Sequence, residues 1–274
     1  MAKDSLYRDR NLQVIFGVTL TSVMGVSSIT PAFPSIIREL GISGAQVGLL
    51  LTFFTLPGII LTPLFGVVAD RFGRRRLLVP CLFLFGIAGT ACAFTRDFDT
   101  LLVLRALQGI GWAALGSMRT TIIGDLYSGR QRAEVMGLST AVLNIALFCY
   151  PIVGGALALQ GWYYPFLLSI IAIPVGILVL TKLKSPEPRS AGSLHQYLRG
   201  IGGHLKNVRL VILFVAAMLV FLIFWGTYLT YFAVHLGEAF DASPLIIGLI
   251  LSSRSFGSAA VSSQLGRISH RFSL

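Results

Sequence analysis

Two arginines, Arg105 and Arg254, lie inside long apolar runs of this sequence, at about residues 100–121 and 244–266. Arg254 lies about ten residues, or about 15 Å, into its run, near the middle of a bilayer. Charged side chains at that depth usually mark a path for a substrate or an ion. We therefore expect Arg254 to meet an anionic ligand or an acidic side chain, or to form a structural ion pair. Arg105 lies about 8 Å from the outer end of its run, close enough to snorkel.

Groups that could carry out covalent or metal chemistry are few and scattered. The sequence contains no HExxH, no GxSxG and no phosphate-binding loop. The histidines, at positions His195, His204, His235 and His270, have no neighbouring nucleophile or metal partner. The cysteines, Cys81, Cys92 and Cys149, lie in apolar runs without CxxC spacing, as expected of small packing residues. We expect no enzymatic activity, no metal and no cofactor.

The elements that must position the arginines are membrane-spanning helices. Of the 274 residues, 55% are hydrophobic and 12% charged, far too apolar a composition for an ordinary soluble domain. A span needs about 20 apolar residues. Uncharged stretches of that length lie between Arg10 and Arg38, Glu39 and Asp70, Arg76 and Arg96, and Arg209 and Glu238; residues 135–181 form two more, divided at Gln160 and Gly161. With the two arginine-containing runs, the sequence predicts an all-α polytopic membrane protein of eight helices.

The basic residues fix the expected orientation. With a cytoplasmic N-terminus, 18 Lys and Arg residues fall in inner segments and only Arg38 and Arg96 in outer ones. This asymmetry follows the positive-inside rule and accounts for most of the +11 net charge, so nucleic-acid binding is not needed to explain it. We expect a multi-pass protein of the plasma membrane.

An internal repeat indicates two related halves. At an offset of 200 residues, GLLL from Gly48 matches GLIL from Gly248, and Arg71-Phe72 matches Arg271-Phe272. Parallel repeats of this kind build two six-helix halves. We expect an N-terminal six-helix bundle in residues 1–181, a cytoplasmic linker with a basic amphipathic helix in 182–209, and the first two helices of a C-terminal bundle in 210–274. The chain is then a fragment that lacks about four helices.

The segment GVVADRFGRRR, Gly66–Arg76, resembles the signature loop GxxxDRxGRR of the major facilitator superfamily. The alternative is a basic turn that merely obeys the positive-inside rule. The resemblance implies a conformational latch in which Asp70 and Arg74 form a charge cluster with Asp125; the latch residues are Gly66, Asp70, Arg71, Gly73, Arg74, Arg75 and Asp125. We expect Gly66 to allow close helix approach, Gly73 a tight turn, and Asp70 to accept bonds from a helix N-terminus.

Two further segments resemble motifs of the same family. In the fourth helix Arg105, Gln108 and Gly109 fit RxxQGxGxA, and in the fifth Pro151, Gly154 and Gly155 fit the GPxxGG of drug and proton antiporters. Ala146 and Tyr150 depart from the latter pattern, which equally fits a proline kink with small packing residues. Since the family's cavity is lined by helices one, five and seven, further candidates are Ser27, Ser28, Asn144, Tyr228 and Tyr231. Their alternative is routine hydrogen bonding between helices.

The resemblance implies a secondary transporter that moves a small molecule by alternating access, with efflux preferred on the helix-five segment. An importer of an organic anion or metabolite, and a sensor or scaffold with the transporter fold, are the alternatives. No Asp or Glu lies within the eight runs, so proton coupling is left open. We expect a monomer whose partners are a small-molecule substrate and the lipid bilayer.

Overall fold

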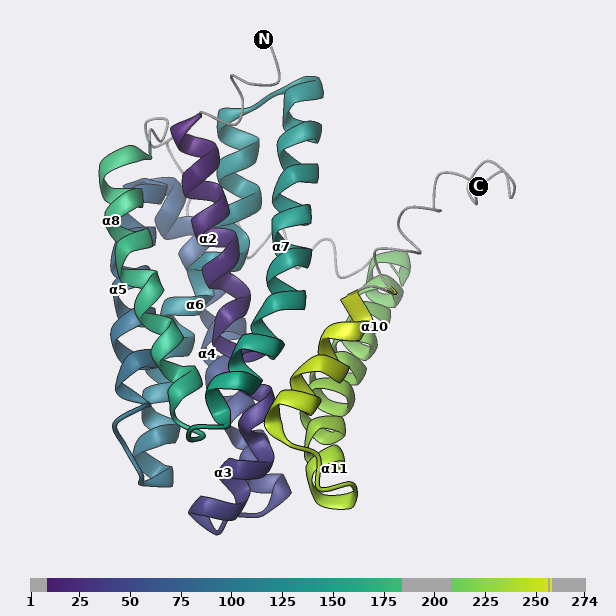
Figure 1. Cartoon of the computed structure of the whole chain (residues 1–274). Coiled ribbons are helices and arrows are strands. Elements are labelled where there is room, and N and C mark those ends of the chain that lie inside the picture. Colours follow the sequence, from purple (N-terminus) through teal and green to yellow (C-terminus); the bar gives the residue numbers. More distant parts are fainter. Residues whose placement is uncertain (1–8, 184–207, 256, 258–274) are drawn as a thin grey trace.

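The structure is a computed structural model that describes residues 9–183, 208–255 and 257 (Figure 1). Every regular element in these residues is helical. The elements are α2 (Arg10–Ser27), η1 (Thr30–Ala32), α3 (Phe33–Leu40), α4 (Gly44–Phe72), α5 (Arg74–Ala91), α6 (Phe98–Leu126), α7 (Gly129–Ala158), η2 (Tyr164–Ile171), α8 (Ala172–Lys182), α10 (Val208–Leu222), η3 (Ile223–Tyr231), α11 (Phe232–Ala239) and an apolar helix Pro244–Ser255. The predicted all-α fold is confirmed, and five of the helical segments are long and apolar enough to cross a membrane.

The first span, Arg10–Leu40, is built in two pieces. The α2 helix ends at Ser27, and a 3-10 turn that begins at Thr30 and contains Pro31 leads into α3. The Ile29 N–H donates to the Val26 carbonyl, three residues back, instead of to the Gly25 carbonyl. The break therefore releases the carbonyl of Gly25 from the regular helical pattern.

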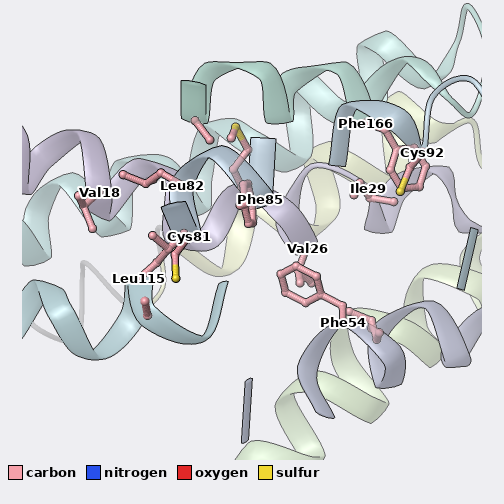
Figure 2. Close-up of a cluster of buried hydrophobic side chains, with 14 of the residues drawn as sticks. Val18, Val26, Ile29, Phe54, Cys81, Leu82, Phe85, Cys92, Leu115 and Phe166 are labelled. Carbon is pink, nitrogen blue, oxygen red and sulfur yellow. The ribbon is translucent and has the colours of Figure 1, made fainter. Parts of the chain in front are cut away.

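The first set of helices, α2 to α8, packs around one apolar core. Phe54 of α4 lies edge-to-face against Phe85 of α5 at 6.3 Å, and Figure 2 shows both rings with Val26 of α2. Glycines let α6 approach its neighbours, because a Cβ at Gly109 would collide with the Phe54 carbonyl and one at Gly111 would lie 2.6 Å from the Cys81 carbonyl. Small residues have this role in membrane bundles, where lipid gives helices no hydrophobic reason to associate.

The second set, α10 to Pro244–Ser255, joins the first along only part of its length. Its central segment η3 is a nine-residue π-helix, a rare conformation that often occurs at functional sites. Helix α11 packs on α3, η3 packs on α4, and Pro244–Ser255 packs on α7. Figure 1 shows α10 diverging from α7 away from these contacts.

The two ends of the bundle differ in charge. We call the end that holds Arg10, Arg74, Arg130 and Lys182 the arginine-rich end, and the end that holds Arg38 and Arg96 the opposite end. The contacts between the two helix sets lie toward the opposite end. The predicted linker of residues 182–209 falls mostly outside the described residues.

Candidate functional site

A charge cluster at the arginine-rich end joins three helices. The Arg74 guanidinium, at the start of α5, lies 2.7 Å from the Asp70 carboxylate near the end of α4. Its Nε donates to the Asp125 carboxylate near the end of α6. The Arg74 and Asp125 side chains are 15% and 20% exposed, against 48% for Asp70. The structure thus brings together the three residues predicted to form the latch, and Arg74–Asp125 is its less exposed pair.

The turn before Arg74 explains one glycine of the loop but not the other. Gly73 has φ of 94°, a conformation open to glycine and unfavourable for other residues, and this sharp turn aims Arg74 back at Asp70. A Cβ at Gly66 would meet nothing within 4 Å, so the predicted close helix approach there is wrong. Arg71 lies over the Phe72 ring at 5.6 Å and Arg75 is exposed, so neither belongs to the cluster.

The expectation for Asp70 also changes. Its carboxylate pairs with the Arg74 side chain four residues later, across the α4–α5 turn. The Arg74 pairing is the one that the family resemblance implied, whereas the bonds from a helix N-terminus that were also expected for Asp70 are not found among the described residues.

Arg105 is fully buried, with 0% exposure, so it does not snorkel, which its position in the sequence had allowed. Its Nη1 donates to the Gly25 carbonyl at 2.8 Å and to Gln108 Oε1 at 2.8 Å. The guanidinium lies over the rings of Phe54, at 4.8 Å, and Phe166, at 5.5 Å. Arg105 therefore takes the carbonyl that the break in the first span releases, at the negative end of the α2 dipole.

Gln108 and Gly109 connect this network to neighbouring helices. Gln108 Nε2 donates to Ser169 Oγ at 3.0 Å, which ties α6 to η2. A Cβ at Gly89 would collide with Gln108 and Ser169, so α5 packs directly on this pair. The helix-four residues Arg105, Gln108 and Gly109 therefore form one buried unit that orders four elements.

The helix-five residues lie at the contact between the two helix sets. A Cβ at Gly154 would collide with the Ser28 carbonyl, and one at Gly155 with the Pro244 carbonyl. From the other side, a Cβ at Gly248 would collide with the Pro151 carbonyl. One turn further, Ser252 Oγ donates to the Phe148 carbonyl at 2.6 Å. Pro151 and Gly155 thus seat the Pro244–Ser255 helix against α7 at the opposite end of the bundle, whereas Gly154 packs α7 against the end of α2 within the first set.

Of the cavity candidates, two are placed elsewhere than predicted. Ser27 and Ser28 are 4% and 1% exposed, and Ser28 Oγ donates to the Met24 carbonyl within the helix break. Both serines therefore serve packing at the broken first span. Asn144 of α7 and Tyr231 of η3 are exposed on the described chain, and Tyr231 stacks on His235 at 6.1 Å.

Arg254 and Tyr228 lie together between the Pro244–Ser255 helix and η3. The Arg254 guanidinium lies 5.9 Å from the centre of the Tyr228 ring. The Tyr228 hydroxyl donates to the Leu251 carbonyl at 3.0 Å, and its ring stacks on Phe232 at 5.8 Å. An aromatic surface and a cation adjoin here, on the π-helical part of the seventh span.

Two polar contacts in the half of the bundle toward the arginine-rich end were not predicted from the sequence. Tyr127, just after α6, donates to the Asp9 carboxylate at 2.5 Å, and burial and this carboxylate raise the pKa of Tyr127. Asp9 also accepts from Asn11 N as the N-cap of α2, which an Asp before an apolar run does signal. Arg119 Nη1 donates to Ser139 Oγ at 3.3 Å inside the bundle, and nothing in the sequence pairs these residues.

Among the described residues, no three His, Cys, Asp or Glu side chains gather to hold a metal.

Comparisons with known proteins agree with this geometry. The chain is 33% identical over 165 residues to a bacillibactin exporter of Bacillus subtilis, covering 57% of this chain and 41% of that protein. It is 25% identical over 250 residues to Multidrug resistance protein 2 of the same organism, covering 88% of this chain and 62% of that protein. The chain thus spans less than two thirds of either relative.

The fold is similar to that of solved transporters. A bacterial homologue of the human lysosomal transporter Spinster, in an inward-facing and unoccupied conformation, superposes with a TM-score of 0.77 at 19% identity, over 95% of this chain and 62% of that one. The sequence model described as Major Facilitator Superfamily matches residues 15–274. This chain therefore belongs to the Major Facilitator Superfamily, as its loop between the second and third spans had suggested, and is a multi-pass integral membrane protein.

Proposed function

We propose that this chain acts in secondary active transport and moves a small molecule out of the cell by alternating access. The observation that carries the proposal is where the two helix sets meet. Helices α3, α4 and α7 contact the second set toward the opposite end, while the Arg74 cluster joins α4, α5 and α6 at the arginine-rich end. The two helix sets thus touch at the opposite end, and the charge cluster lies within the first set at the arginine-rich end. This arrangement supports two bodies that rock about a central site.

The arginine-rich end is the cytoplasmic one in this proposal, which places the N-terminus in the cytoplasm of a plasma-membrane protein. Arginine and lysine accumulate on that side because positively charged loops are retained there during insertion. The contacts between the two helix sets then close the external side, as in an inward-facing transporter. In the outward-facing state the Arg74 cluster is expected to meet the second half and hold the cytoplasmic side closed.

Arg254 and Tyr228 are the substrate residues we propose. The Arg254 guanidinium, which the length of its apolar run places near the middle of the membrane, lies 5.9 Å from the centre of the Tyr228 ring. Tyr228 belongs to the π-helical segment η3, where helix geometry departs from the regular pattern. Such a pair suits a substrate that carries an anionic group and an unsaturated ring. Export is preferred because the relatives include a protein named as an exporter and a multidrug resistance protein, and because the helix-five segment lies at the contact between halves.

The test is transport by inverted membrane vesicles from cells that express the protein. Organic anions and organic cations are offered separately, with and without an imposed pH gradient, which also examines whether protons are the coupling ion. We expect uptake of at least one compound above that of vesicles without the protein. If the uptake of every compound equals that of vesicles without the protein, the transport proposal is wrong.

Matched variants then examine the site. Arg254→Gln is expected to lose anion transport and Arg254→Lys to keep part of it, while the exposed Arg130→Gln leaves transport unchanged. Equal transport by the Arg254 variants and the Arg130 control would separate Arg254 from the substrate while leaving the transport activity standing.

A further inference from the structure

Arg105 has more hydrogen-bond donors than the surrounding protein satisfies. Its Nη1 is saturated by the Gly25 carbonyl and by Gln108 Oε1. Its Nε and Nη2 are buried and, among the described residues, have no hydrogen-bond partner. Three N–H bonds of a cation therefore point into the interior without an acceptor. Leaving such groups unsatisfied is costly, more so when they carry charge.

The charge of Arg105 is also only partly balanced. No ion pair joins Arg105 to a carboxylate of residues 9–183 or 208–255. The carbonyl end of α2, which it contacts through Gly25, supplies about half an elementary negative charge. The faces of Phe54 and Phe166 add cation–π attraction but accept no in-plane N–H bond. A net positive charge remains in a region of low dielectric constant.

The Trp162 indole adds a further donor close to the rings that cover Arg105. Trp162 Nε1 is buried and lacks a partner among the described residues, and the Trp162 ring lies 6.2 Å from Phe166, one of the rings beneath Arg105. A water molecule that accepted bonds from these groups would bring two more donors of its own, its O–H bonds, into the same region. An anion only accepts, so it suits a region with surplus donors.

We propose that the interior of the first helix set binds a small monovalent anion, of chloride size, on Nε and Nη2 of Arg105. The full burial of Arg105 excludes a large organic anion, which separates this site from the proposed substrate residues Arg254 and Tyr228. The bound ion neutralises the guanidinium and allows Arg105 to hold the break of the first span through Gly25. The site is structural and does not depend on the direction or substrate of transport.

The test compares halides with a larger anion on the purified protein. Thermal unfolding is followed in sodium gluconate while chloride or bromide replaces gluconate at constant ionic strength. We expect chloride and bromide to raise the unfolding temperature with saturation, and sulfate at the same ionic strength to have no such effect. Arg105→Gln is expected to lose the halide response, whereas Arg130→Gln, which removes an exposed cation at the arginine-rich end, keeps it.

A direct binding measurement covers the case in which Arg105→Gln does not fold. Equilibrium dialysis with radioactive chloride is expected to find saturable binding to the unaltered protein, and at least tenfold weaker binding to Arg105→Lys, whose ammonium cannot present the same fork of donors. The absence of saturable chloride binding by the unaltered protein overturns the proposal. An equal halide response in the Arg105 and Arg130 variants overturns it too, because the ion then binds elsewhere.

Discussion

The Arg74 cluster predicts a marked inequality between its two carboxylates. A hydrogen bond between charged groups contributes about 1.5 to 3 kcal/mol, and the Arg74 and Asp125 side chains are only 15% and 20% exposed. Asp125→Asn should therefore cost about 2 kcal/mol. Asp70 is 48% exposed and lies four residues before Arg74, so Asp70→Asn should cost about 0.5 kcal/mol. Asp125 of α6, and not the signature aspartate Asp70, should therefore contribute more to the stability of the described fold.

Reversible unfolding of the purified protein, with increasing denaturing detergent in mixed micelles, measures both costs. The double-mutant cycle of Arg74→Gln and Asp125→Asn should give a coupling of at least about 1 kcal/mol, as residues in one ion-pair network do. Arg75→Gln, an exposed neighbour outside the cluster, is the control and should change stability by less than about 0.5 kcal/mol. A loss for Asp70→Asn that equals or exceeds that for Asp125→Asn, or a coupling near zero, would refute the burial argument.

Three further changes probe other contacts. Gly155→Leu should abolish transport with the first helix set still folded, as seen by vesicle flux beside circular dichroism, because the side chain collides with the Pro244 carbonyl where the two sets meet; unaltered flux would contradict this. The raised pKa of Tyr127 means that its contribution to stability, fully present below about pH 10, is lost as pH rises further. Tyr127→Phe should therefore remove about 1.5 kcal/mol at neutral pH and flatten alkaline unfolding; equal alkaline slopes in both proteins would count against the bond to Asp9. Cysteines at positions 38 and 241, whose native side chains pair through Arg38 Nη1 and the Asp241 carboxylate at 3.4 Å, should be joined by a bifunctional maleimide that contains a disulfide, and this cross-link between the two sets should stop transport until it is reduced.

The sequence was sufficient to predict the helices and the members of the Arg74 cluster. Lipid requires long uncharged stretches, so the spans and the ends of the cluster helices follow from the positions of charges alone. The grouping of Asp70, Arg74 and Asp125 was implied by the resemblance of the Gly66–Arg76 loop to a family motif, and the structure brings the three side chains together. Depth in the membrane is thus readable from one sequence.

The direction in which a side chain points around its helix axis is much harder to predict from one sequence, and the wrong expectations concern this direction. Ser27 and Ser28 are at the expected depth but face the broken first span, and Arg105 faces a backbone carbonyl that only the break makes available. The carbonyl leaves no signal in residue types. The π-helix of Ile223–Tyr231 was also not predicted, because its residues would fit a regular helix equally well.

The two-piece first span has a consequence for how the halves divide. One piece, α2, belongs to the first helix set through the bond from Arg105 to Gly25. The other piece, α3, is seated on the second set, because a Cβ at Gly237 of α11 would collide with Pro34 of α3. If the two sets move apart at that end, either α3 leaves α11 or it swings with it about the turn at Pro31. In the latter case the boundary between the two bodies crosses the middle of the first span, and the bond from Arg105 to Gly25 keeps the α2 side of that boundary in the first helix set.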